Sequence, residues 1–281
     1  EQKMTNHRLR VMWFVPPAIA VAASWQECAD LSLETSRTQS SDEQFAALSG
    51  GSIDAVVTSM DNVFHWNHRP GPKDFVIVAQ VETTTPLSIV ASPRIKSVSD
   101  LGGAKILVDA PENGFVIALR AMLNQAGLNL PDYTLTPVGG VKERYLALVK
   151  GEGDATLLGP PFDALAIKEG MHKVAEVQAS YPEFPGQGLV VRKSSLSSNP
   201  GIKLWLKALS EALALLPANL EKLRNSLSNE GFPDGAVSAM VQSVPTSLTP
   251  NERGVNLLIE HRQLLGLIGS DATYDQVVYQ G

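Results

Sequence analysis

The chain has 281 residues, of which 44% are hydrophobic and 19% are charged. This length and composition indicate one large domain or two smaller ones, with a core too large for a disordered chain. The net charge of −6 and the lack of a basic run argue against a nucleic-acid partner. The single cysteine, Cys28, excludes an intrachain disulfide and a cysteine-based metal cluster. No apolar run reaches the roughly 18 residues of a membrane span.

The first part of the chain alternates between predicted strands and helices. Pro16-Pro17 breaks the first apolar run, and the next helix begins near Pro17, where a missing N–H costs little. Strands are predicted over residues 8–15, 31–36, 53–58 and 75–79, and helices over 17–28, from Ser41 to the glycine at 51, and over 60–65. The order βαβαβαβ favours a parallel, doubly wound sheet.

The same order begins again after a break near Pro86. A strand at 87–90 and a linker at 92–94 precede it. Strands are predicted over 105–109, 133–138, 154–158 and 174–177, and helices over 114–125, 141–149 and 162–168. A last strand at 189–192 is followed from Pro200 onward by helices only, and their apolar stripe, which includes Trp205, is expected in the core.

One motif occurs twice, one hundred residues apart. Residues 43–55 and 143–155 share a glutamate, an Ala-Leu pair, a glycine at 51 and 151, and an Asp-Ala pair in the same register. Each copy reads as a short helix, a glycine stop and an apolar strand, and the glycines are typical of a helix C-terminus with positive φ. Ser41 and Gln44 have the spacing of a capping box at the first helix. A repeat in this register indicates a duplicated unit.

The duplication predicts two α/β lobes and a helical tail. We expect residues 1–91 together with 189–281 to form lobe 1 and residues 92–188 to form lobe 2. The strands at 87–91 and 188–192 lie at the lobe boundaries, so their pairing would make a hinge of two crossover strands with a cleft between the lobes. The fold class is therefore α/β, with a doubly wound sheet in each lobe and a helical C-terminal tail.

The residues that line such a cleft follow from the strand ends. Ligands of open α/β sheets lie beyond the carboxyl ends of the strands, where helix N-termini point at them. Helix capping is the alternative role of Ser41, Asp61 and Asn113, and one of Trp13 and Phe14 is expected in the core. The predicted ligand-binding residues are Trp13, Phe14, Ser40, Ser41, Ser59, Asp61, Asn62, Glu112, Asn113, Gly114, Phe115, Gly140, Gly159 and Phe162. Their hydroxyls, amides and rings suit a small organic molecule.

Several segments of the chain carry a family resemblance. They are Ser40-Ser41-Asp42-Glu43-Gln44, the two Gly-x-x-Asp-Ala units, Ser97-Val98-Ser99-Asp100-Leu101-Gly102-Gly103-Ala104-Lys105-Ile106, and Pro111-Glu112-Asn113-Gly114-Phe115. With the two-lobe duplication, these resemble the type II periplasmic solute-binding proteins of ABC importers, in the branch that binds nitrate, sulfonates, taurine and thiamine precursors. The resemblance covers residues 8–192 well and the tail loosely. It implies export, a cleft that closes, and delivery to a membrane permease.

The chain departs from the anion-binding members of that family at two loops. The predicted cleft positions there hold Met60-Asp61-Asn62 and Pro160-Pro161-Phe162. This departure leaves the identity of the ligand open. It would carry a planar or aromatic group, with a carboxylate or sulfonate as one alternative, and the acidic residues of the cleft would take amines or hydroxyls.

Other chemistries have weaker support in the sequence. No phosphate loop, dinucleotide fingerprint or Gly-x-Ser-x-Gly elbow occurs. His65 and His68 with Asp61 form a candidate metal site, and Asp61, Glu112 and His65 are the acid–base candidates of an enzyme on the same scaffold. The effector domain of a transcription regulator is a further alternative.

The sequence therefore predicts a non-enzymatic, substrate-binding component of an ABC importer, with a small-molecule ligand, a membrane permease as partner, no nucleic acid and no cofactor. We expect a monomer, periplasmic or lipid-anchored outside the cytoplasm. The chain opens with Glu1-Gln2-Lys3-Met4 and no signal-like apolar region, as the mature form of an exported protein would.

Overall fold

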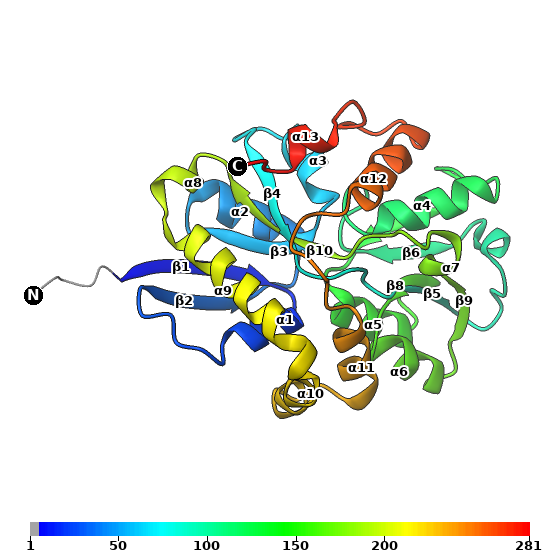
Figure 1. The fold of residues 1–281 in the computed structure, drawn as a ribbon. Helices are drawn as coiled ribbons and strands as arrows, with labels where there is room; N and C mark the ends of the chain where they lie inside the picture. Colours follow the sequence, from blue (N-terminus) through cyan, green and yellow to red (C-terminus); the bar gives the residue numbers. More distant parts are fainter. Residues whose placement is uncertain (1–5) are drawn as a thin grey trace, which may run out of the picture.

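The computed structural model of the chain describes residues 6–281, which form two five-stranded sheets flanked by helices (Figure 1). The first sheet has the order β2-β1-β3-β10-β4 and the second has the order β7-β6-β8-β5-β9. The strands of the first are β1 (His7–Trp13), β2 (Leu31–Arg37), β3 (Ala55–Ser59), β4 (Phe75–Gln80) and β10 (Gln187–Arg192). Those of the second are β5 (Ser88–Ala91), β6 (Lys105–Val108), β7 (Thr134–Pro137), β8 (Ala155–Leu158) and β9 (His172–Glu176). Each sheet with its helices is called a lobe below.

Each sheet is mixed, with one antiparallel strand among parallel ones. In the first sheet β1 is parallel to β2 and β3, while β10 is antiparallel to β3 and β4. In the second sheet β6 is parallel to β7 and β8, while β5 is antiparallel to β8 and β9. The two sheets therefore share one topology, which is the duplication that the sequence predicts. The parallel order predicted from the sequence did not include this antiparallel strand.

The strands at 87–91 and 188–192, whose pairing would have made the hinge, do not pair with each other. β5 lies inside the second sheet and β10 inside the first, so the sheet boundary does not coincide with the expected division after residue 91. The chain segments immediately before these strands pair instead. The Val81 N–H donates to the Gln187 carbonyl at 2.9 Å and the Gly186 N–H to the Thr83 carbonyl at 3.2 Å.

The helices of the two lobes cover the sheet faces. The first lobe has α1 (Ala18–Ala23), α2 (Ser41–Gly50) and α3 (Asn62–Trp66). The second has a 3₁₀ turn, η1 (Val98–Leu101), then α4 (Val116–Gln125), α5 (Val141–Val149), α6 (Phe162–Lys168) and α7 (Val177–Ser180). The helix predicted over 17–28 ends at Ala23, where the Ser24 hydroxyl turns back to the Val21 carbonyl.

The two copies of the repeated motif adopt the same local conformation. Gly51 follows α2 and Gly151 follows α5, and both glycines have φ of +78°, which a side chain rarely adopts. The N-cap of α2 is Ser40, whose hydroxyl accepts from the Glu43 N–H at 3.1 Å. Ser41 is the first helical residue, so the predicted capping box that begins at Ser41 is wrong and Ser40 caps the helix instead.

The repeated aspartate explains why the motif recurs. The Asp54 carboxylate accepts from the Arg10 N–H on β1 at 2.8 Å, and the Asp154 carboxylate accepts from the Lys105 N–H on β6 at 2.7 Å. Each aspartate thus ties the loop before its strand to the neighbouring parallel strand of the same sheet. A charge-assisted bond to backbone is among the stronger kinds of hydrogen bond.

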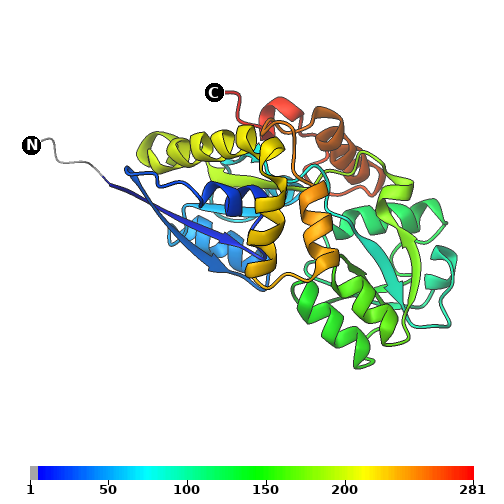
Figure 2. The same cartoon turned by 60° about the horizontal axis from the view of Figure 1, so that its bottom comes forward.

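The helical tail covers both lobes. It comprises α8 (Ser195–Ser198), α9 (Gly201–Leu215), η2 (Leu216–Ala218), α10 (Leu220–Asn229), α11 (Asp234–Gln242), α12 (Glu252–Leu264) and α13 (Tyr274–Val277). α9 packs against α1 and β1, with Trp205 buried beside Trp13 at 6.4 Å between ring centroids, as the apolar stripe predicts. α12 packs against α4 of the second lobe, and Figure 2 shows α11 between the lobes. No helix in residues 6–281 has the length and apolarity of a membrane span.

Candidate functional site

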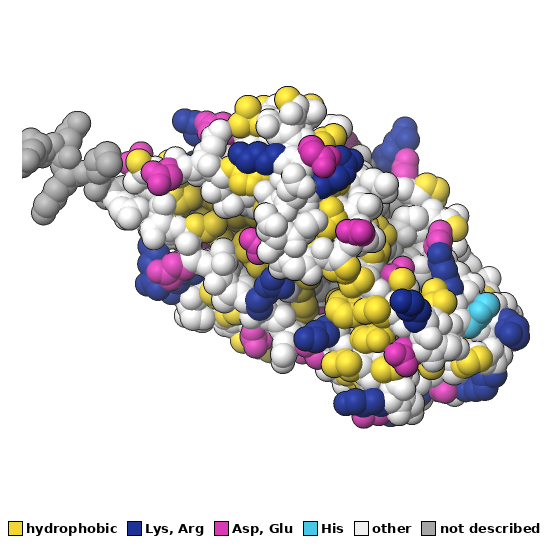
Figure 3. Space-filling view, turned by 90° about the horizontal axis from the view of Figure 1, so that it is seen from below, with side chains coloured by type: hydrophobic (Ala, Val, Ile, Leu, Met, Phe, Trp, Pro, Cys, Tyr) yellow, Lys and Arg dark blue, Asp and Glu magenta, His cyan; other side chains and the backbone are white. Residues whose placement is uncertain are grey.

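A cavity of about 260 Å³ lies between the lobes. Its walls come from the ends of β1, β3, β6 and β8, from the connecting segments that pair near residues 82 and 187, and from α11. Figure 3 shows this face hollowed between the lobes, with hydrophobic side chains at the hollow. The strand ends therefore meet at the cleft, as expected of open α/β sheets.

Most of the predicted ligand-binding residues line this cavity. They are Phe14, Ser41, Ser59, Asn62, Asn113, Gly114, Phe115, Gly140, Gly159 and Phe162. The reason is topological, because each follows the carboxyl end of a strand or begins the next helix.

Trp13 and Ser40 lie outside the cavity lining. Trp13 is 6% exposed and packs on Trp205, so it is the core member of the Trp13–Phe14 pair. Strand alternation places these consecutive side chains on opposite faces. Ser40 is occupied as the N-cap of α2.

Asp61 and Glu112 also lie outside the lining. Asp61 is fully buried and forms an ion pair with Arg262 of α12 at 3.0 Å. The Glu112 side chain is 60% exposed and stands 3.7 Å from the His65 ring. Neither residue therefore lies where the prediction placed it, because Asp61 is paired with a distant helix and the Glu112 side chain points largely into solvent.

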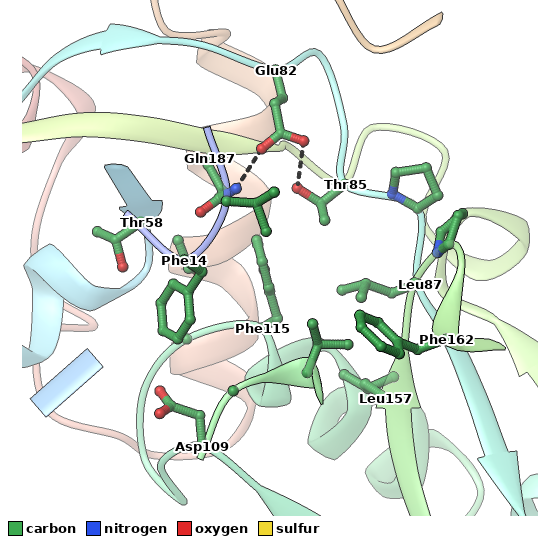
Figure 4. Close-up of a pocket in the computed structure, with 18 of the residues that line it drawn as sticks. Phe14, Thr58, Glu82, Thr85, Leu87, Asp109, Phe115, Leu157, Phe162 and Gln187 are labelled. Carbon is green, nitrogen blue, oxygen red and sulfur yellow. Dashed lines mark hydrogen bonds between the residues drawn. The ribbon is translucent and has the colours of Figure 1, made fainter. Parts of the chain in front are cut away.

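Aromatic rings form the apolar walls of the cavity (Figure 4). Phe115, just before α4, meets Phe184 edge-on at 5.6 Å between centroids. Phe162, at the start of α6, packs on Tyr145 at 5.4 Å. Phe14 comes from the first lobe, so rings of both lobes face the cavity. Rings held by other rings offer a stiff surface for a flat ligand.

Among the lining residues, two pairs make polar contacts directly between the lobes. The Ser41 N–H of the first lobe donates to the Asp109 carboxylate of the second at 3.2 Å, and the Ser41 hydroxyl donates to the same group. The Asn113 amide donates to the Asn62 carbonyl oxygen at 2.7 Å. Burial raises the pKa of Asp109, and the Ser41 hydrogen bonds oppose that rise. The lobes are therefore in contact beside the cavity.

Glu82 brings a carboxyl group to the cavity from the connecting segment, and the sequence prediction did not include it. One carboxyl oxygen accepts from the Gln187 amide at 2.5 Å and the other from the Thr85 hydroxyl at 3.4 Å (Figure 4). Burial raises the pKa of Glu82 to about 7, although these hydrogen bonds act to lower it. No sequence signal marks Glu82, because its place depends on the crossing of two distant segments.

Arg144 is the cationic side chain among the lining residues. Its Nε donates to the Thr156 hydroxyl at 3.0 Å, and Nη1 and Nη2 donate to the carbonyls of Gly139 and Leu157, each at 2.9 Å. Burial lowers the pKa of Arg144 to about 10, so it stays charged at neutral pH. The three nitrogens thus donate to β8 and to the loop that follows β7.

The tail supplies a wall that the sequence prediction missed. Phe232, Met240 and Ser243 line the cavity from α11 and its flanks. The apolar residues of α11 are spaced as in an ordinary core helix. Periodicity alone therefore does not place this helix at a cleft.

The candidate metal site of Asp61, His65 and His68 does not assemble. Asp61 faces Arg262, and the His68 ring hydrogen-bonds the Phe64 carbonyl at 2.9 Å. Burial lowers the pKa of His65, and the nearby Arg69 lowers it further. Within residues 6–281 no cluster of three or more His, Cys, Asp or Glu has the arrangement of a metal site.

This two-lobe fold with its inter-lobe cleft is the fold of type II periplasmic binding proteins. The model of the NMT1-like family matches residues 10–224, and the chain belongs to that family. A search of curated proteins gives no match. The family match ends within α10, so it includes both sheets.

Solved structures with the same fold include two sulfonate-binding proteins. The alkanesulfonate-binding protein SsuA from Xanthomonas axonopodis pv. citri, bound to MOPS, is 18% identical with a TM-score of 0.74, over 98% of this chain and 96% of that one. The periplasmic aliphatic sulphonate-binding protein SsuA from Escherichia coli is 20% identical with a TM-score of 0.71, over 98% and 93%.

The periplasmic nitrate-binding protein NrtA from Synechocystis PCC 6803 is also similar. It is 13% identical with a TM-score of 0.73, over 98% of this chain and 84% of that one. At these identities the similarity concerns the fold, which the resemblance in the sequence predicts correctly.

Proposed function

We propose that the protein is the extracytoplasmic substrate-binding component of an ABC importer and binds a small organic molecule in the cleft between its lobes. The observation that carries the proposal is the cavity itself, which both lobes line with aromatic rings and hydrogen-bonding groups. Apolar walls with a few convergent polar groups are the usual make-up of a small-molecule site. The family and fold support a binding role and not an enzymatic one.

The lobes are proposed to rotate about the paired connecting segments. On the strand pairings, the first lobe would comprise residues up to about 81 and from about 187 onward, and the second would comprise the residues between them. Two backbone hydrogen bonds join the segments, at Val81–Gln187 and Gly186–Thr83. The inter-lobe contact of Ser41 with Asp109 would form on closure and break on opening.

A ligand drives closure only as far as it binds the closed state better than the open one. The cavity walls supply that difference, because a ligand in it touches Phe14 of the first lobe and Phe162 of the second at once. The closed form would then be what a membrane permease recognises. Location outside the cytoplasm, free or lipid-anchored, belongs to the same proposal.

Thermal-shift and scattering measurements on the whole chain test this function. The panel holds nitrate, alkanesulfonates, aromatic acids, amines and alcohols, and a ligand at 100 times its Kd adds about 2.7 kcal/mol to the free energy of unfolding. We expect one chemical class to raise Tm and to reduce the radius of gyration. Absence of any shift, with no small molecule in a denatured extract by mass spectrometry, would contradict the proposal.

The enzyme alternative finds less support. Its acid–base candidates were Asp61, Glu112 and His65, and Asp61 is fully buried against Arg262. Glu112 and His65 approach each other outside the cavity lining, at 3.7 Å. A binding role needs none of these groups.

A further inference from the structure

We propose that the cleft takes a flat, largely apolar molecule with hydrogen-bond donors, as amine or hydroxyl groups, at two ends, and that Glu82 and Asp109 accept from those donors. The inference rests on the proposed function and names the chemical class of its ligand. It also separates this chain from a site built for anions such as sulfonate or nitrate.

The placement of the two carboxyl groups is the first observation. Glu82 reaches the cavity from the connecting segment, and Asp109 reaches it from the end of β6. Figure 4 shows them at opposite ends of the labelled group, with the rings of Phe14 and Phe115 between them in this view. A flat ring system between those phenyl groups would present its ends to the two carboxyls.

The charge of the lining is the second observation. Its charged side chains are Glu82, Asp109 and Arg144. The guanidinium of Arg144 is committed through all three nitrogens to Thr156, Gly139 and Leu157. The lining therefore holds two carboxyls against one guanidinium, which stays charged but already donates to protein groups, and this balance disfavours an anionic ligand relative to one that donates hydrogen bonds.

The surroundings of Glu82 are the third observation. The described groups that face its carboxyl are the side-chain amide and backbone N–H of Gln187 and the Thr85 hydroxyl, all neutral. Its pKa of about 7 shows how poorly this setting stabilises the charged form. A protonated amine would supply the missing cationic partner and make a charge-assisted hydrogen bond.

Three probes of one shape but different end groups test the inference. They are benzene-1,4-dimethanamine, benzene-1,4-dimethanol and terephthalate, titrated by calorimetry into the full chain beside nitrate and benzenesulfonate. We expect the diamine to bind best, the diol next, and every anion at least about tenfold more weakly than the diamine, the loss that follows from one charged hydrogen bond.

Variants and pH identify the groups that accept. Glu82→Gln is expected to weaken the diamine by about 10- to 100-fold and to affect the uncharged diol less. The matched control is Glu112→Gln, an exposed carboxyl outside the lining, with no expected change. The affinity of the unmodified chain for the diamine should rise about tenfold from about pH 6 to about pH 8 as Glu82 ionises. In Glu82→Gln, the share of this pH dependence that comes from Glu82 should disappear.

The outcomes distinguish failure of this inference from failure of the proposed function. Preference for nitrate, benzenesulfonate or terephthalate over the diamine would overturn the ligand class and leave the binding function intact. Diamine binding that Glu82→Gln and Asp109→Asn leave unchanged would overturn the roles of these residues. A panel in which nothing binds, on protein shown to carry no small molecule, counts against both.

Discussion

Arg262 on α12 and Asp61 before α3 form an ion pair from which solvent is fully excluded. Nη1 of Arg262 lies 3.1 and 3.0 Å from the two carboxylate oxygens of Asp61, and both side chains are 0% exposed. The same nitrogen donates to the Glu112 carbonyl at 3.2 Å, and Asp61 accepts from the Gly114 N–H at 2.7 Å. The pair therefore joins the tail, the first lobe and the second lobe at one point.

Removing one partner of this pair should destabilise the fold strongly. Arg262→Met leaves the Asp61 carboxylate buried without its counter-charge, and we expect a loss of about 3–5 kcal/mol in the free energy of unfolding. Urea denaturation measures it. The matched control is Arg253→Met on the same helix, whose partner Glu183 is exposed, with an expected loss below about 1 kcal/mol. Equal losses for the two variants would contradict the prediction.

Stability should depend on pH through Glu82. Its pKa is raised from 4.5 to about 7 on folding, so the folded state holds a proton that the unfolded state has released. The stabilisation is full below the unfolded pKa and is lost as pH rises through the folded pKa. Compared with Glu82→Gln, the Tm of the unmodified chain should fall between about pH 5 and about pH 7 and then level off.

The comparison with Glu82→Gln removes the pH effects of every other group. A Tm difference that stays constant across this range would show that Glu82 titrates near its ordinary pKa. The measurement needs no ligand, so it stands apart from the identity of what binds.

The Ser41–Asp109 contact should favour the closed arrangement of the lobes. Ser41→Ala removes the hydroxyl that donates across the cleft and keeps the helix intact, so the population should move toward open forms. Small-angle scattering should show a larger radius of gyration without ligand. Ser52→Ala, which removes a hydroxyl within the first lobe, is the control and should leave it unchanged. An unchanged radius for Ser41→Ala would mean that the contact does not hold the lobes.

Gly140 should matter because the second lobe approaches the first there. A Cβ at this position would lie 2.8 Å from the Glu143 carboxylate, at the far end of a flexible side chain of the same lobe, and 3.2 Å from the Phe14 ring, which belongs to the other lobe. Gly140→Val should therefore weaken closure and ligand affinity by at least about tenfold while leaving Tm near its original value. Gly50→Val, with open space around it, is the control. A large drop in Tm for Gly140→Val would indicate damage within the second lobe instead.

The fold follows from the sequence wherever local signals agree. The repeated helix, glycine and strand at 43–55 and 143–155 are local patterns, and both glycines have the positive φ that their position predicts. The sheet order depends on long-range pairing, which periodicity does not specify. The insertion of β10 between β3 and β4 is therefore visible only in the structure.

The candidate site likewise has residues that local sequence signals locate and residues that only long-range contacts locate. Residues at strand ends, such as Phe14 and Phe162, could be placed at the cleft because topology alone brings strand ends together. Asp61 could not be distinguished from a ligand-binding residue, since its partner Arg262 is 201 residues away. Glu82 went unrecognised because its position depends on the contact with Gln187, 105 residues away.

The place of β10 also sets the order in which the lobes can be completed as the chain is made. All strands of the second sheet lie between Ser88 and Glu176, so that sheet can close once this continuous stretch is available. In the first sheet, β4 joins its neighbours only through β10, which begins at Gln187. Until then β3 is an unprotected edge and β4 has no sheet to join, so the earlier-made lobe is the later one to mature. Pairing over so long a separation is slow, which leaves the newly made strands β1 to β4 in need of protection from aggregation.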